Sequence, residues 1–121
     1  MSDATAFDGR MIRDYDVAVR MRDGVTLRVD VYRPDAPGRF PVLYACAMHN
    51  KDLQRVELAE NLKVGQPSWS TQWYGVIEAG DSKRFVANGY VHVIGQVRGG
   101  HKSEGELGQG DEWDHYDTIE W

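Results

Sequence analysis

The stretch YDVAVRMRDGVTLRVDVYRP, residues 15–34, carries the clearest structural signal in the chain. Apolar and polar residues alternate on both sides of Asp23-Gly24, which is the pattern of two strands that each bury one face. Both turn residues tolerate a positive φ, so they predict a two-residue hairpin turn. We therefore expect an antiparallel hairpin with an inward face made of Val17, Val19, Met21, Val25, Leu27, Val29 and Val31.

Two continuous apolar runs follow the hairpin, FPVLYACAM at 40–48 and YVHVIGQV at 90–97. Runs of this length are typical of strands buried on both faces of a parallel sheet. Between them, residues 81–90 predict a helix with Asp81 as N-cap and Gly89 just past its end.

The last segment, DEWDHYDTIEW at 111–121, predicts a further helix with solvated acids in its first turn. The order of elements predicts an α/β fold, in which an antiparallel hairpin leads into a parallel sheet flanked by helices. We expect residues 1–13 to be a loose amino-terminal segment and residues 14–121 to form one partial domain. No further parallel strand follows the last helix, so we expect a chain truncated within its domain.

Composition excludes several classes of protein. The formal net charge of −5 argues against a nucleic-acid-binding face. No apolar run approaches the roughly 20 residues that a membrane-spanning helix needs. The polar start MSDATAFDGR carries no apolar signal core, so a cytoplasmic location is expected. The lone Cys46 sits in an apolar run and is interpreted as a buried small residue rather than a nucleophile.

The glycine-rich stretch VRGGHKSEGE, residues 97–106, raises the question of a nucleotide site. A phosphate loop needs G-x-x-x-x-G-K-[ST], and here His101 separates Gly100 from Lys102. A G-x-G-x-x-G fingerprint does not fit the glycines either. The four histidines lack the i, i+4 spacing of a helical zinc site, so neither a metal nor another cofactor is expected. His92, between two valines, predicts either an outward-facing or a hydrogen-bonded interior side chain.

The chain contains no G-x-S-x-G nucleophile elbow. Ser103 precedes Gly105 but has His101 where the elbow needs glycine. By its own residues the chain therefore has no Ser-His-Asp triad.

Four stretches occur together in one order: VAVRMRDGVTLRVDVYRP, FPVLYACAMHNKD, FVANGYVHVIGQVRGGHKSEGE and YDTIEW. As a set they resemble the amino-terminal part of the catalytic domain in the X-prolyl dipeptidyl peptidase and cocaine esterase (CocE/NonD) family. The resemblance runs from about Asp14 to Trp121. It implies an α/β-hydrolase fold and a serine nucleophile on the strand after the YDTIEW-like helix, with the triad Asp and His later still. By this resemblance all three lie beyond the chain, which is expected to be inactive alone.

The resemblance also implies site residues. In the family, a Tyr after the first buried strand donates its hydroxyl to the oxyanion hole, and the matching residue is His49, followed by Asn50 and Lys51. We take these three as candidates for the oxyanion hole or pocket lining, because an imidazole N–H can also donate to an oxyanion. The alternative is that His49 caps the strand end.

Other candidates have both a structural and a binding interpretation. Arg98 is expected to brace its loop against neighbouring carboxylates, or to bind a substrate carboxylate. Trp69, Trp73 and Tyr74 line an acyl pocket or pack under a loop.

The function expected is part of a serine acyl hydrolase that cleaves ester, amide or X-Pro peptide bonds through an acyl-enzyme, with a small molecule or short peptide as substrate. The alternative is a non-catalytic binding or assembly module, whose sheet edge pairs with a partner or with another copy in a homo-oligomer. A nucleotide-binding domain using residues 99–103 is the remaining rival.

Overall fold

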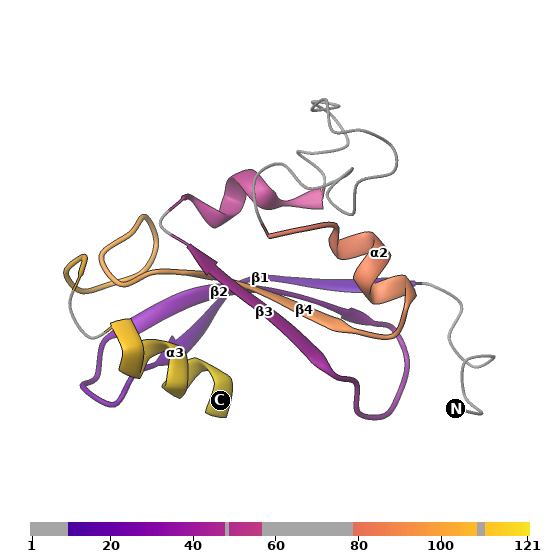
Figure 1. The fold of residues 1–121 in the computed structure, drawn as a ribbon, viewed down its shortest axis with the longest axis horizontal. Coiled ribbons are helices and arrows are strands. Elements are labelled where there is room, and N and C mark those ends of the chain that lie inside the picture. The colour runs from indigo at the N-terminus through magenta and orange to yellow at the C-terminus, as the bar shows by residue number, and fades with distance from the viewer. Residues whose placement is uncertain (1–9, 48, 57–78, 109–110) are drawn as a thin grey trace.

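The structure is a computed structural model that describes residues 10–47, 49–56, 79–108 and 111–121. Within the described residues, four strands form one mixed sheet in the order β1-β2-β4-β3. Figure 1 shows the short helices η2 and α2 on one side of this sheet and α3 on the other. In these ranges no helix combines the length and the apolar character that crossing a membrane requires. The elements are β1 (Met11–Arg20), β2 (Thr26–Pro34), β3 (Val42–Ala47), η2 (Lys51–Gln54), α2 (Ser82–Ala87), β4 (Val91–Gln96) and α3 (Asp111–Glu120).

The predicted hairpin is confirmed, with β1 and β2 antiparallel and Val19 paired with Leu27. The prediction of a two-residue turn is wrong. Met21 still bonds Val25, so the loop between them has three residues, and within it only Gly24 has a positive φ, of 91°. A tight turn followed by a glycine in the left-handed region is the usual three-residue solution. β1 also begins at Met11, inside the segment expected to be loose.

The hydrophobic core lies on both faces of the sheet, because neighbouring β4 residues point in opposite directions. Val93 packs with hairpin residues in one cluster, and Ile94 packs in the other with Tyr32 and with Val86 of α2. The predicted α2 is confirmed with its caps. The carboxylate of Asp81 accepts from a backbone N–H of the first turn, and Gly89 follows the end at a φ of 85°.

The continuous apolar run at 40–48 does form a strand, and β3 pairs in parallel with β4. The expectation that it is buried on both faces is wrong. Among the described residues β3 is the outermost strand on its side of the sheet, and Val42 and Leu43 are 56% and 36% exposed. Cys46 is half-buried rather than buried. An apolar run indicates that a strand can be buried. Whether the strand is buried depends on a neighbouring element that covers its outer side.

His92 on β4 takes the interior alternative left open by the sequence. Its Nδ1 lies 2.7 Å from the Ser82 hydroxyl, and its ring contacts Phe85 edge-on. Burial lowers the pKa of His92 to about 4, although a hydrogen bond with the backbone of Ala79 acts in the opposite direction. The folded chain therefore holds this imidazole neutral at physiological pH.

This burial predicts a specific pH dependence of stability. His92 has a pKa of 6.5 in the unfolded chain and about 4 in the folded chain. Its contribution to the free energy of unfolding is therefore fully present above pH 6.5 and is lost as the pH falls from 6.5 to 4. The loss reaches roughly 3 kcal/mol. Urea unfolding at pH 7.0 and 4.5 measures it. The difference should shrink in His92→Asn and persist in the exposed control His101→Asn; equal pH slopes in wild type and His92→Asn would contradict it.

Candidate functional site at the carboxyl ends of β3 and β4

The parallel strands β3 and β4 end at the same edge of the sheet, where Ala47 pairs with Gln96. In Figure 1 the chain after β3 turns into η2 at this edge, and the loop after β4 lies beside the hairpin. Sites of open α/β sheets form at such carboxyl ends, because the loops leaving neighbouring strands converge there. This edge also holds His49, Asn50 and Lys51, which the family resemblance selected.

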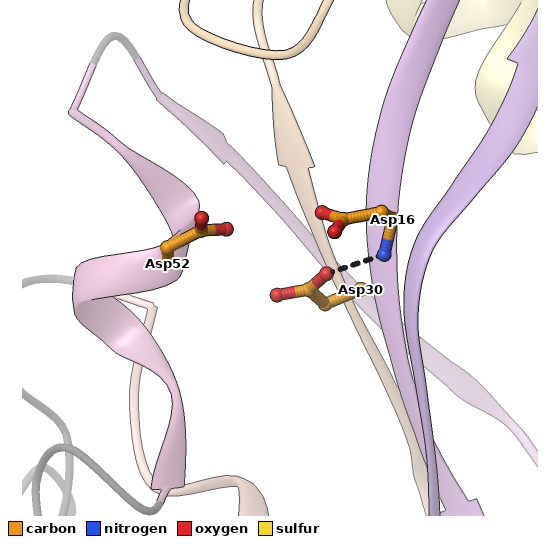
Figure 2. A group of neighbouring side chains, drawn as sticks. All are labelled: Asp16, Asp30 and Asp52. Atoms are coloured by element: carbon orange, nitrogen blue, oxygen red, sulfur yellow. Dashed lines mark hydrogen bonds between the residues drawn. The ribbon is translucent and has the colours of Figure 1, made fainter.

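Lys51 lies at the centre of this region as a buried ammonium, 1% exposed. Its Nζ donates to the carboxylates of Asp16, Asp30 at 2.8 Å and Asp52 at 2.9 Å. Figure 2 shows the three carboxylates directed toward one another from β1, β2 and η2. An ammonium has three protons to donate, and all three have acceptors here. Burial disfavours the charged form, but the three carboxylates outweigh it and raise the pKa of Lys51.

The backbone of β1 is bent to bring Asp16 into the group. The β1–β2 register shifts between Asp14 and Val17, and Asp16 has a φ of 56°, which few non-glycine residues adopt. Its N–H donates to Asp30 Oδ1 at 3.0 Å. Partial burial opposes ionisation of Asp16, but hydrogen bonds from Lys51 and Lys102 prevail and lower its pKa to about 2.

Two further cations complete the charge balance. Arg55, whose guanidinium lies 4.0 Å from the Tyr15 ring centroid, donates to Asp30 Oδ2 at 3.0 Å. Lys102, from the loop after β4, donates to Asp16 at 3.0 Å and lies 2.8 Å from an oxygen of Asp52. Three carboxylates thus meet three cations, which we call the charge cluster: Asp16, Asp30, Asp52, Lys51, Arg55 and Lys102.

The carboxylates of the charge cluster alone have the spacing of a metal site, since one oxygen from each lies within 4.8 Å of the others. The ammonium of Lys51 is within hydrogen-bonding distance of all three. The protein's own cations therefore supply the positive charge that these carboxylates require.

The residues after β3 are held by hydrogen bonds from both directions. The Lys51 N–H donates to Gln96 Oε1 at 2.8 Å, and the Asn50 side chain accepts from Asp52 N at 3.0 Å as the cap of η2. His49 is exposed beside them. Of the three candidates, His49 is an exposed residue, the Asn50 side chain caps η2, and the Lys51 side chain is buried.

The glycine-rich loop after β4 is built as scaffold. Ser103 is buried, and its hydroxyl accepts from Arg28 N at 3.0 Å and donates to Gln96 O at 2.8 Å. Gly99 has a φ of 75°, and a Cβ there would lie 2.3 Å from Leu107 N; a Cβ on Gly100 would lie 2.7 Å from the Gln96 side chain. Both positions therefore require glycine, because other parts of the chain leave no room for a Cβ atom. The Ser103 hydroxyl is hydrogen-bonded to β2 and β4.

Arg98 forms a second charged group, between the hairpin turn and α3. Its guanidinium donates to Asp114 with bonds of 2.8 and 2.7 Å and to Asp23 with bonds of 2.6 and 3.2 Å, as the bracing interpretation predicts. The expectation that Asp114 is a solvated acid is wrong, since it is 5% exposed and faces Arg98. Binding of a substrate carboxylate by Arg98 stays a prediction. Trp69, Trp73 and Tyr74 lie outside the described residues.

Sequence reasoning missed the acidic half of the charge cluster and Gln96. Asp30 stands in an alternating strand, on the face that a lone hairpin would give to water. Its partner Lys51 lies 21 positions away, and Lys102 lies 86 positions from Asp16. No local pattern connects such residues; the one signal was a lysine shortly after the apolar run at 40–48.

Comparison with known proteins gives consistent matches. The family model of the X-Pro dipeptidyl-peptidase (S15 family) matches residues 23–121. Cocaine esterase of Rhodococcus sp. (strain MB1 Bresler) is 39% identical over 116 residues, which are 94% of this chain and 17% of that protein.

Two solved structures support the same relationship. A CocE/NonD family hydrolase from Staphylococcus aureus superposes with a TM-score of 0.73 at 33% identity, over 92% of this chain and 20% of that one. An α-amino acid ester hydrolase gives 0.66 at 25% identity, over 92% and 18%. The chain thus spans about a fifth of the length of these relatives, and the predicted α/β-hydrolase architecture is confirmed for it.

The charge cluster predicts unequal roles for its two lysines, which both contact Asp16 and Asp52. Lys51→Met should cost about 3–5 kcal/mol of unfolding free energy, because it removes the ammonium that pairs with the fully buried Asp30 carboxylate. Lys102→Met is the matched control: Lys102 is 47% exposed, and its loss should cost less than about 1 kcal/mol. Urea unfolding at pH 7 measures both. Similar losses in the two variants would contradict burial as the cause.

Proposed function

The chain belongs to the X-Pro dipeptidyl-peptidase (S15) family of serine hydrolases, and from this we propose that it forms part of a serine acyl hydrolase that cleaves ester, amide or X-Pro peptide bonds. The observation that carries the proposal is the convergence of the loops after β3 and β4 at one sheet edge, with His49 exposed there and the backbone beside it anchored. This segment would build one wall of the active site.

The proposed reaction proceeds through an acyl-enzyme. A serine hydroxyl carried outside these residues attacks the substrate carbonyl and passes its proton to a histidine base, and the carbonyl oxygen becomes an oxyanion. The leaving alcohol or amine departs with that proton, and water then hydrolyses the acyl-serine bond. Neither a metal nor an organic cofactor enters these steps.

His49 is the proposed donor to the oxyanion. By the family resemblance, His49 matches the tyrosine that follows the first buried strand, and an imidazole carries at least one N–H in either protonation state. Preorganised donors of this kind stabilise the charge that develops in the transition state. Asn50 and Lys51 would support this donor, because Asn50 caps η2 and the donors of the Lys51 side chain are given to carboxylates.

The proposal is tested on the complete reading frame that encodes this sequence, expressed and assayed with p-nitrophenyl butyrate. We expect hydrolysis, labelling of a serine by a fluorophosphonate, and a fall in kcat of roughly 100-fold in His49→Ala with a smaller change in KM. The 121-residue chain alone should show neither turnover nor labelling.

His101→Asn, which changes an exposed histidine of the neighbouring loop, is the control and should keep the wild-type kcat. Full activity in His49→Ala would overturn the assignment of the oxyanion donor. A complete reading frame that a fluorophosphonate does not label would overturn the proposed function itself.

A second candidate, an assembly module, is favoured by the exposed apolar surface. Val42 on the edge strand is 56% exposed, and on α3 Trp113 and Ile119 are 51% and 68% exposed. Unpaired strand edges of this kind accept another strand. Under this candidate, light scattering of the 121-residue chain gives the mass of a dimer, and Val42→Lys returns it to a monomer. A folded wild-type monomer would contradict it.

A further inference from the structure

We propose that Gln96 and Lys51 are positioning residues that fix the backbone carrying His49. The inference rests on the proposed function for its purpose, but the arrangement it describes can be tested without any activity. It assigns to the end of β4 a role in shaping the loop after β3.

The first anchor is a hydrogen bond to the backbone. Gln96 is the last residue of β4, is 1% exposed, and accepts the Lys51 N–H at 2.8 Å. The chain leaves the sheet at Ala47, which pairs with this same Gln96. One β4 residue therefore marks both the end of β3 and the start of η2, and His49 lies in the short span between them.

The second anchor is the side chain of the residue that Gln96 holds. The Lys51 ammonium donates to Asp30 at 2.8 Å, and Asp30 lies on β2 opposite Ile94 of β4. Lys51 is thus attached by its backbone to one strand and by its side chain to the next. With two attachments on one residue, rotation of the preceding chain about its bonds is limited.

The Gln96 backbone is itself held, because its carbonyl accepts the buried Ser103 hydroxyl at 2.8 Å. The Gln96 side chain occupies the space beside Gly100, because a Cβ on Gly100 would lie 2.7 Å from the amide nitrogen of Gln96. The glycine-rich loop after β4 therefore supports Gln96, and Gln96 supports the residues after β3. This gives the loop a part in the site through the contacts of Ser103 and Gly100 with Gln96.

A closely matched control is available in the same region. Gln54 of η2 is 3% exposed, and its Oε1 accepts a backbone N–H, that of Ala79, at 2.7 Å. Gln54→Met and Gln96→Met each remove one buried acceptor and keep the side chain's length. A general loss of stability would affect both variants alike, whereas positioning would affect only Gln96→Met near His49.

The experiment is amide hydrogen exchange by NMR on the 121-residue chain, with the ring and backbone shifts of His49 recorded in parallel. In Gln96→Met the Lys51 amide should exchange at least tenfold faster and the His49 signals should move, while the Val93 amide keeps its rate. In Gln54→Met the Ala79 amide should accelerate and the His49 signals should stay. Equal effects of both variants on Lys51 and His49 would overturn the proposal.

The wild-type chain gives a measurement that does not depend on whether a variant folds. The Lys51 amide lies outside the sheet, yet it should be protected against exchange to within tenfold of the β4 amides. Exchange at the rate of an unprotected amide would overturn the proposal. In the complete reading frame, Gln96→Met should lower kcat and leave KM nearly unchanged. Slowed exchange at Lys51 without any esterase activity would retain the positioning and reject the hydrolase function.

Discussion

The structure depends on one buried negative charge, the Asp30 carboxylate in the second strand, which has no exposed surface. A carboxylate in that setting must be met by donors on every side. It receives the N–H of Asp16, the ammonium of Lys51 and the guanidinium of Arg55. The bulge in β1 and the start of η2 follow from this requirement. The buried Asp30 carboxylate thus fixes the geometry of the candidate site, although it has no contact with solvent.

The opposite face of the sheet uses charge in a different way. Arg98 joins the hairpin turn to α3 through Asp23 and Asp114, and Arg22 adds a bidentate pair with Asp117 while it lies 4.0 Å from the Trp113 ring. On α3, Asp114 and Asp117 therefore face these arginines while Trp113 and Tyr116 are exposed, which at these positions inverts the pattern of an ordinary amphipathic helix. An exposed apolar face of this kind suits a helix that packs against a further apolar surface.

The sequence predicted the features that local pattern controls. Alternation identified the hairpin, and Asp81 and Gly89 marked the ends of α2. It failed where distant residues decide the outcome: the exposure of β3 depends on its place at the sheet edge, and the burial of Asp114 depends on Arg98. The same distinction applies to the residues of the candidate site. Family resemblance selected His49 through Lys51, but the acids that hold Lys51 come from strands with no sequence pattern that links them.

The equality of three carboxylates and three cations in the charge cluster constrains how this sequence can change over time. A neutral substitution at any buried member leaves an unmatched charge among groups that water reaches poorly. The next tolerated change is then one that removes the opposite charge. Members of the cluster should therefore vary in pairs among related sequences, and most tightly at Asp30 and Lys51, while the exposed Lys102 drifts more freely.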